Sequence, residues 1–194
     1  MAAWCQAQAR AKFIRKRMSQ ALPRDPKKYH CIGREPFGQG SYGKVYVYHE
    51  EATRECVAVK RQRLPSEAAQ NELAMFKLLN DCPHKRVMKL LDYYVSKADG
   101  KTFYLCMVFP FMDQTLEHVW VNRCGLLQVD VARRFLHHAV MGVAHLHSRG
   151  IVHGDLSLSN FHVGSETGFK PNQEGSDGFP ASVVKVSDLG GAAC

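Results

Sequence analysis

Alternation of apolar and polar positions predicts several β-strands in this chain. Val45 and Val47 alternate with Tyr46 and Tyr48, the two-residue period of a strand with one buried face. Short apolar runs predict further strands, because such runs suit strands buried within a sheet. These runs are residues 56–60, residues 103–111 and a valine-rich stretch over residues 183–186.

Two other segments repeat their apolar residues every three or four positions, which predicts helices. In residues 65–80, Leu73, Phe76 and Leu79 follow Ala69, and Pro65 suits the first turn. In residues 130–149, five apolar residues mark one face and Gly150 is placed to end the helix. The five are Val131, Phe135, Ala139, Val143 and Leu146.

Two segments differ in composition from these elements. Residues 1–28 form a basic leader, expected to be flexible, whose apolar residues have helix-like spacing before prolines end any helix. They are Trp4, Ala11, Ile14 and Met18, followed by Pro23 and Pro26. Residues 164–182 are rich in glycine and proline and predict a long exposed loop.

The overall composition is that of a folded protein, and its net charge lies mainly in the leader. Hydrophobic residues make up 45% and charged residues 23% of the 194 residues, which excludes a disordered or fibrous chain. The chain has 26 basic and 18 acidic residues, for a net charge of +8. Eight of the basic residues but only one acidic residue, Asp25, lie in residues 1–28, so the remaining body is nearly neutral.

The charge of the leader leaves four interpretations open. It suits a nuclear signal, an organelle transit peptide, a segment that binds acidic surfaces, or a solvated extension of the folded body. We do not expect nucleic acid as a partner, because only Trp4 and Phe13 offer the aromatic rings that single-strand binding uses.

Cysteine and histidine usage narrows the compartment and the chemistry. The seven cysteines stand singly, without a C-x-x-C pair, which indicates reduced thiols and a cytoplasmic or nuclear location. No apolar run approaches the roughly 18 residues of a membrane span. The ten histidines have no cysteine at zinc-ligand spacing, so we do not expect a structural metal site.

A glycine-rich segment gives the first chemical signal. In Gly38-Gln39-Gly40-Ser41-Tyr42-Gly43-Lys44-Val45, three glycines let the backbone approach phosphate groups closely, although such turns are common. A dinucleotide-binding fold would have a helix next, whereas here a strand follows. The segment therefore predicts a glycine turn between two antiparallel strands.

Lys60 gives the second signal, seventeen residues after Gly43. A lysine that closes an apolar strand usually lies along the surface, but beside a glycine turn it is placed to reach nucleotide phosphates. Glu72 is its expected partner, because it lies next to the apolar stripe of the helix predicted over residues 65–80. Glu67 is the nearest competitor.

The third signal is a set of polar residues after the second predicted helix. Asp155 and Asn160 lie in Ile151-Val152-His153-Gly154-Asp155-Leu156-Ser157-Leu158-Ser159-Asn160, and Asp188 opens Asp188-Leu189-Gly190 after the last strand. A single acid in a loop is more often a cap or turn former. Together the three supply one candidate base and two oxygen ligands suited to Mg²⁺.

With these motifs in this order, the chain from Tyr29 to Cys194 resembles the eukaryotic protein kinase family. Within it, Pro65-Ser66-Glu67-Ala68-Ala69-Gln70-Asn71-Glu72 is similar to the P-S-T-A-I-R-E helix of the cyclin-dependent group, and residues 108–116 are similar to its hinge. The resemblance implies an α+β fold over residues 29–194. A small antiparallel sheet with one regulatory helix forms the N-lobe (29–111). A hinge (109–115) and an incomplete helical C-lobe (116–194), with a loop insertion at 164–182, complete it.

The resemblance also implies roles for the residues of the motifs in binding ATP and Mg²⁺. Gly38, Gly40 and Gly43 would cover the phosphates, with Val45 and Ala58 over the adenine. Lys60 would hold the phosphates, positioned by Glu72. Phe109 would be the gatekeeper, and the carbonyl of Pro110 and the amide of Met112 would bind the adenine edge. Asp155 would be the catalytic base, with Asn160 and Asp188 as ligands of Mg²⁺.

Several positions depart from the family pattern. Gly154 replaces an arginine, Ser157 replaces a lysine that touches the transferred phosphate, His162 replaces an apolar residue beneath the adenine, and Leu189 replaces a phenylalanine. Glu72 follows Lys60 by only twelve positions. The chain stops four residues after Gly190, so we expect a piece of a larger fold. The apolar faces of residues 130–149 and of the last strand should then be exposed.

Two functions fit these motifs. The first is an ATP-dependent protein serine/threonine kinase, acting on a protein hydroxyl and regulated by a cyclin-like or other protein. The second is a catalytically impaired, pseudokinase-like module that binds nucleotide or serves as a scaffold, which Gly154, Ser157 and His162 favour.

Overall fold

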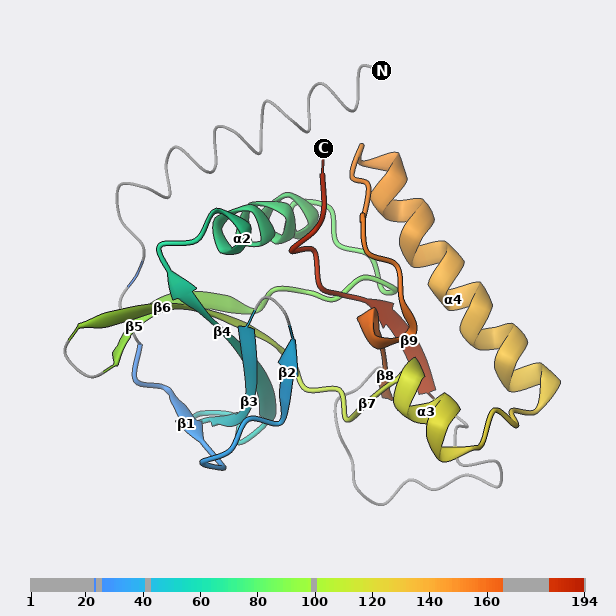
Figure 1. Cartoon of the computed structure of the whole chain (residues 1–194), viewed down its shortest axis with the longest axis horizontal. Coiled ribbons are helices and arrows are strands. Elements are labelled where there is room, and N and C mark those ends of the chain that lie inside the picture. The colour runs from blue at the N-terminus through green and yellow to red at the C-terminus, as the bar shows by residue number, and fades with distance from the viewer. Residues whose placement is uncertain (1–22, 24–25, 41–42, 99–100, 166–181, 194) are drawn as a thin grey trace.

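The computed structural model describes residues 23, 26–40, 43–98, 101–165 and 182–193 of the chain. Within these residues, a larger antiparallel sheet comes first and a smaller one follows (Figure 1). The larger sheet has the order β1-β3-β4-β6-β5, with β2 paired to β3. Its strands are β1 (Tyr29–Cys31), β2 (Gly38–Gly40), β3 (Gly43–Glu50), β4 (Cys56–Leu64), β5 (Asp92–Ala98) and β6 (Thr102–Pro110).

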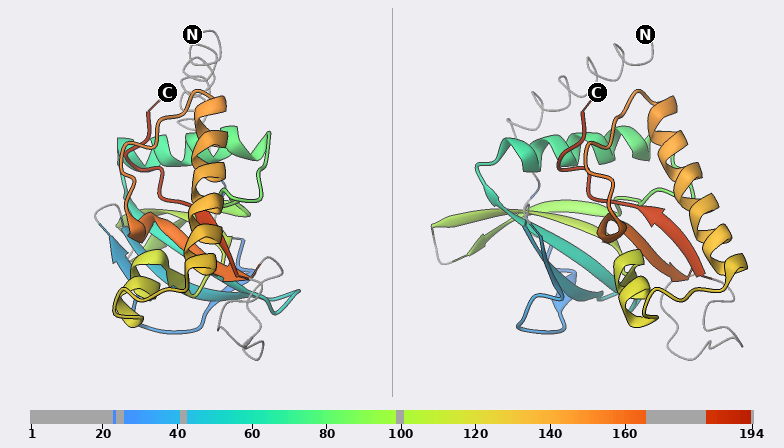
Figure 2. Two further views of the ribbon diagram at one scale, coloured as in Figure 1. Left: turned by 90° about the vertical axis from the view of Figure 1, so that its right-hand side faces the viewer. Right: turned by 45° about the vertical axis from the view of Figure 1, so that its right-hand side comes forward.

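The smaller sheet and two helices form the second half of the described structure. Its strands are β7 (Gln114–Thr115), β8 (Phe161–Ser165) and β9 (Ser182–Val186), in the order β7-β8-β9. Helix α3 (Leu116–Asn122) follows β7 directly, and α4 (Val129–Ser148) packs along β9 (Figure 2). A short 3₁₀ turn, Leu158–Asn160, leads into β8.

Both faces of the larger sheet are buried at its centre. On one face Leu105, Met107 and Phe109 join the main core beneath helix α2 (Glu67–Asn80), and the other face forms a second apolar cluster. The second cluster comprises Tyr29, Val57, Val59, Tyr94, Cys106 and Val108. Burial on both faces explains why β4 and β6 contain continuous apolar runs rather than strict alternation.

Helix α2 lies across the sheet and confirms the helix predicted over residues 65–80. It begins at Glu67 because the Ser66 hydroxyl accepts a hydrogen bond from the Ala69 amide at 3.2 Å, an N-cap that satisfies one of the free amides of the first turn. The predicted stripe of Ala69, Leu73, Phe76 and Leu79 is buried, as is Glu72 beside it.

Helix α4 confirms the helix predicted over residues 130–149, but neither of the two expected apolar exposures occurs. On the predicted apolar face, Val131, Phe135 and Leu146 are buried and Ala139 and Val143 are half-buried, whereas the exposed Leu136 and Val140 lie outside that stripe. The valines of β9 are not exposed either: Val184 is fully buried between β8 and α4. The expectation of an exposed last strand is wrong because α4 itself covers that strand. No helix among the described residues is long and apolar enough to cross a membrane.

The predicted strands are confirmed, but four further strands among the described residues were not predicted: β1, β5, β7 and β8. Residues 45–48, 56–60 and 183–186 fall in β3, β4 and β9, and residues 103–110 fall in β6, which ends one residue before the predicted boundary. Of the unpredicted strands, β5 pairs with β6 from Asp92 to Ala98. Its alternating Tyr93 and Val95 carried a period-two signal that could have revealed it.

The ends of the predicted leader and loop contact the sheets. The Val95 amide donates to the Pro23 carbonyl at 2.7 Å, and Lys28 Nζ lies 3.0 Å from Asp92 Oδ2, so the last residues of the leader pack on the larger sheet. Residues 1–22 and 24–25 lie outside the described residues. The loop predicted at 164–182 is shorter than expected, because Gly164 and Ser182 belong to β8 and β9, and residues 166–181 lie outside the described residues.

A tight contact fixes α4 against the segment that precedes β5. Gly142 faces this segment, and a Cβ at Gly142 would lie 2.5 Å from the Arg86 carbonyl oxygen and 3.1 Å from Val186 Cγ1. The backbone of residues 86–88 cannot shift away from α4 without losing hydrogen bonds. The Val186 amide donates to the Arg86 carbonyl at 3.0 Å, and the Met88 amide donates to the Val186 carbonyl at 2.9 Å.

Gly142→Ala should therefore lower the free energy of unfolding by about 2 kcal/mol. At a helix position with free space, the same substitution would raise it by about 1 kcal/mol, because alanine has the higher helix propensity. Urea unfolding of the full chain measures the effect, with the exposed Val140→Ala as a control on the same helix. A Gly142→Ala protein more stable than the wild type would contradict the close packing.

Candidate functional site

A cleft of about 170 Å³ is lined by residues from both halves of the molecule. Ten of the predicted site residues line it, contributed by the glycine segment, β4, α2, the end of β6 and the segment after β9. They are Gly38, Gly40, Gly43, Val45, Ala58, Lys60, Glu72, Pro110, Met112 and Asp188. Asp155 and Asn160 do not line it, but the Ser187 amide donates to the Asn160 carbonyl at 2.9 Å, which joins their segment to that of Asp188.

The glycine segment forms a turn between β2 and β3. Gly40 pairs with Gly43 across it, and residues 41–42 lie outside the described residues. A Cβ at Gly43 would lie 2.6 Å from the Arg61 carbonyl oxygen, so this position tolerates no side chain. A Cβ at Gly38 or Gly40 would meet no atom within 4 Å, so their backbones leave open space for a ligand.

Lys60 lies between two carboxylates at the inner end of the cleft. Its Nζ is 2.8 Å from Glu72 Oε1 and 2.9 Å from Asp188 Oδ1. Lys60 is 8% exposed and Glu72 only 1%, so their ion pair replaces most of the hydration of both charges. Glu67, the alternative partner, is exposed in the first turn of α2.

The electrostatics of this cluster keep the lysine charged. Burial alone would lower the pKa of Lys60, but Glu72 and Asp188 outweigh it and raise the pKa above its usual value. Burial raises the pKa of Glu72, and the ammonium of Lys60 and the amide of Gln62 oppose that shift. The cluster thus presents a fixed cation to the cleft.

Asp155 is oriented by neighbours in its own segment. The Asn160 side-chain amide donates to the Asp155 carbonyl at 2.8 Å and to its carboxylate at 3.2 Å. The Asp155 amide donates to His153 Nδ1 at 3.3 Å, so His153 carries its proton on Nε2, which donates to the Ser187 carbonyl at 2.8 Å. The buried His153 therefore ties the base candidate to the segment that carries Asp188.

A comparison with known families identifies this arrangement. The sequence model described as "Protein kinase domain" matches residues 33–194. The chain belongs to the protein kinase family. The α+β architecture, with a small antiparallel sheet and one helix before an incomplete helical part, is accordingly the kinase fold.

Named relatives of this kinase chain confirm its resemblance to the cyclin-dependent group. It is 33% identical to "Cyclin-dependent kinase B2-1" of Oryza sativa subsp. japonica over 166 residues, which cover 80% of this chain and 46% of the relative. It is 31% identical to "Cell division control protein 2 homolog 2" of Trypanosoma brucei brucei over 172 residues, which cover 85% and 43%. The chain thus spans less than half the length of these relatives.

Two of the departures from the kinase pattern lie beside Asp155. Gly154 has φ +77, and a Cβ there would lie 2.5 Å from the Gly191 carbonyl oxygen. This position therefore differs from the arginine of the family pattern in its backbone conformation as well as in the missing guanidinium. The close approach is fixed by paired hydrogen bonds between Val152 and Ala193, at 2.8 and 2.9 Å. The Ser157 hydroxyl lies 2.8 Å from that of Ser159 and brings no charge to the site.

The oxygen donors of Asn160 and Asp188 fit a divalent cation. Because Asn160 uses its side-chain nitrogen on Asp155, its side-chain oxygen Oδ1, which accepts no hydrogen bond within the described residues, remains for a ligand. Asp188 uses Oδ1 for Lys60 and, at 3.4 Å, for the Gly190 amide; among the described residues no hydrogen bond reaches its Oδ2. Asp188 also has φ 55, an uncommon backbone conformation for a non-glycine residue that is often found at functional sites.

Several residues at the mouth of the cleft were not predicted from the sequence. Phe37 and Phe111 line it, with ring centroids 5.2 Å apart in an edge-to-face contact, and so join the glycine segment to the hinge. Thr115, His118 and the gatekeeper candidate Phe109 also line the cleft. The position of Phe37 directly before the first glycine was the one signal that could have singled it out.

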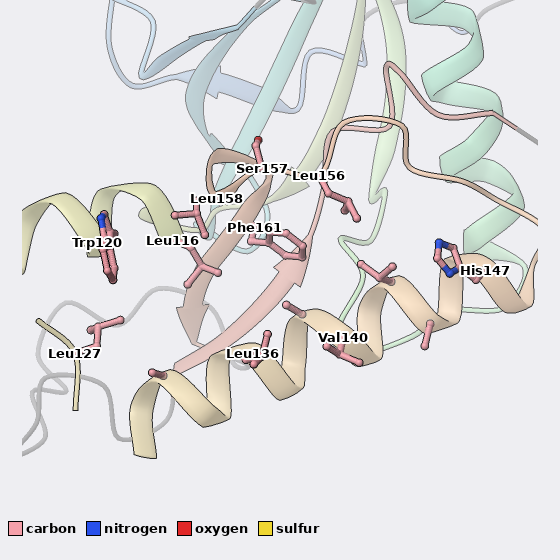
Figure 3. A pocket seen from close by; sticks show the side chains of 14 residues that line it. Leu116, Trp120, Leu127, Leu136, Val140, His147, Leu156, Ser157, Leu158 and Phe161 are labelled. Atoms are coloured by element: carbon pink, nitrogen blue, oxygen red, sulfur yellow. The ribbon is translucent and has the colours of Figure 1, made fainter. Parts of the chain in front are cut away.

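A larger apolar cavity of about 720 Å³ lies away from this cluster, between α3, α4 and the segment that leads into β8 (Figure 3). Leu116, Leu136, Val140 and Phe161 point into it. His147 and Ser157 are among its few polar lining residues. It contains none of the ionised groups that the cleft brings together, so the smaller cleft is the candidate functional site.

Removing one partner of the buried ion pair should cost more than removing both. Lys60→Met leaves the Glu72 carboxylate buried, and we expect the free energy of unfolding to fall by about 3 kcal/mol. Lys60→Met/Glu72→Met replaces the pair by apolar side chains and should recover most of that loss. Urea unfolding of the three proteins tests this, and a double variant less stable than the single variant would contradict it.

His162 should make the protein less stable at acidic pH. Burial, with Lys60 and His118 adding to it and Asp188 opposing it, lowers the pKa of His162 from 6.5 to about 4. His162 therefore becomes protonated near pH 6.5 in the unfolded chain but only near pH 4 in the folded chain. The free energy of unfolding consequently falls as the pH falls through this window. The loss should approach about 3 kcal/mol.

His162→Leu should remove this part of the pH dependence. Urea unfolding in metal-free buffer across the window measures it, with the exposed His137→Leu as a control for the loss of a histidine. An unchanged pH slope in His162→Leu would show that His162 is not the group responsible.

Proposed function

We propose that this chain carries the nucleotide site of an ATP-dependent protein serine/threonine kinase, which transfers a phosphoryl group from Mg-ATP to a protein hydroxyl. The observation that carries the proposal is the ammonium of Lys60, held between Glu72 and Asp188 in a cleft that the glycine turn and the hinge also line. A fixed cation beside open backbone suits the phosphates of a nucleotide.

The remaining walls of the cleft suit the base of the nucleotide. Val45, Ala58, Phe109 and Met112 all line the cleft and offer apolar surfaces. Beyond them, the Pro110 carbonyl and the Met112 amide would bind the adenine edge. Proline is acceptable at position 110 because only a carbonyl is needed there.

Asp155 would act as the base that orients the substrate hydroxyl and accepts its proton. Its carboxylate is exposed, and Asn160 fixes its direction. Asn160 and Asp188 would hold Mg²⁺, which supplies positive charge against the phosphates when bound. With the groups aligned, most of the rate enhancement would come from positioning and from charge stabilisation.

The relatives and the composition extend the proposal to partners and compartment. The relative named a cyclin-dependent kinase favours a cyclin-like or other protein regulator that acts on α2, and a protein substrate with a serine or threonine hydroxyl. The single cysteines favour a reducing compartment, cytoplasmic or nuclear; five of those in the described residues are thiols rather than members of a disulfide.

A second candidate function is a nucleotide-binding module with impaired transfer. Ser157 in place of a lysine favours it, because loss of one stabilising donor costs a transition state about 3 kcal/mol, or more than a hundredfold in rate. This candidate shares the cleft and the cation and differs only in the final step.

Nucleotide binding and phosphoryl transfer by the full chain separate the two candidates. Calorimetric titration with Mg-ATP should show saturable binding that weakens at least tenfold, roughly, in Lys60→Met. Transfer of labelled γ-phosphate to a protein mixture should fall about a hundredfold or more in Asp155→Asn, with binding retained. Binding without transfer supports the second candidate, and absence of nucleotide binding overturns both.

A further inference from the structure

Gln62 is a buried polar residue that the roles assigned above do not use. It follows Lys60 by two positions in β4, so the two side chains emerge on the same face of the strand. Gln62 is 3% exposed and lies beneath α2 rather than in the wall of the cleft.

Gln62 and Lys60 hold the two oxygens of one carboxylate. Gln62 Nε2 donates to Glu72 Oε2 at 2.9 Å, while Lys60 Nζ donates to Glu72 Oε1 at 2.8 Å. The amide orientation follows from chemistry, because a carboxylate accepts hydrogen bonds and only the NH₂ group of Gln62 can donate one. Both oxygens of Glu72 are therefore fixed by neighbouring residues of one strand.

The other end of the Gln62 amide is its carbonyl oxygen, Oε1. Gln62 Oε1 is buried and makes no hydrogen bond within the described part of the chain. An unpaired buried carbonyl oxygen is unfavourable, and an apolar side chain of the same size would avoid that cost. Packing alone thus does not account for glutamine at this position, whereas donation to Glu72 does.

Gln62 also contacts the glycine segment. A Cβ at Gly43 would lie 2.9 Å from Gln62 Cγ, so the stem of this side chain fills the space beside the third glycine. One side chain therefore touches both the base of the phosphate-binding turn and the carboxylate that positions the lysine.

We propose that Gln62 is a positioning residue for nucleotide binding, which holds Glu72 in place so that Glu72 keeps Lys60 directed at the phosphates. The proposal rests on the proposed function of the cleft. Its physical basis is that Lys60 already divides its charge between Glu72 and Asp188 and would also be drawn to a phosphate. Gln62 is neutral, so a bound phosphate does not compete for its hydrogen bond with Glu72.

Gln62→Met tests the hydrogen bond with little change in side-chain volume. We expect the dissociation constant for Mg-ATP to rise about tenfold, as loss of a hydrogen bond to a charged group predicts. Thermal stability should change little, because the unpaired oxygen is removed as well. Gln62→Glu places a second carboxylate against Glu72 and should weaken binding further. Gln70→Met, at a half-buried position on α2, is the matched control and should bind Mg-ATP as the wild type does.

A double-mutant cycle separates positioning from a general structural effect. If Gln62 acts through Glu72, then Gln62→Met should cause no further loss of Mg-ATP affinity in a Glu72→Ala background, whereas independent effects would add. Additive losses, or a Gln62→Met protein with wild-type affinity, would overturn the proposal and leave the proposed function standing. A wild-type chain that binds no Mg-ATP would overturn the proposed function itself.

Discussion

The buried ammonium of Lys60 is the interaction on which the rest of the site depends. A charge that is only 8% exposed is stable when opposite charges replace its water, and the two carboxylates come from α2 and from the segment after β9. Strand β4, helix α2 and the segment after β9 must therefore keep their relative positions for Lys60 to stay charged while it is buried. Asn71, next to Glu72, strengthens that arrangement by donating to the Ala192 carbonyl at 2.8 Å, so the helix and the last segment are also joined directly.

The apolar core gives this cluster its rigidity. Phe76 of α2 packs on Phe109 of β6 with ring centroids 4.9 Å apart, and Leu189, directly after Asp188, is 1% exposed. Phe76, Phe109 and Leu189 belong to the same core cluster, so one continuous apolar core holds α2, the end of β6 and the segment after β9. The polar cluster on its surface then needs only short side-chain hydrogen bonds to be fixed, because the backbone elements beneath it cannot shift independently.

The two sides of the site differ in charge. On the side of the proposed nucleotide site, Lys60 lies within hydrogen-bond distance of both Glu72 and Asp188. Around Asp155, the side that would receive the substrate hydroxyl, Gly154 and Ser157 bring no cation. The left-handed backbone at Gly154, pressed against Gly191, shows that this difference is built into the path of the chain as well as into the side chains. The proposed nucleotide side is therefore charged, whereas the proposed acceptor side has Asp155 and Asn160 without a neighbouring cation from Gly154 or Ser157.

By itself the sequence determined the local features of this protein. Periods of two and of three to four residues are properties of neighbouring positions, so β3, α2 and α4 could be predicted, and so could the glycine turn and the kinase motifs. Only the tertiary structure decided which distant groups meet: that Lys60 also contacts Asp188, that Gln62 holds the second oxygen of Glu72, and that α4 covers the valines of β9. These features depend on the relative placement of whole elements and on what packs over them. That placement is set by contacts between positions up to 128 residues apart, which no local pattern records.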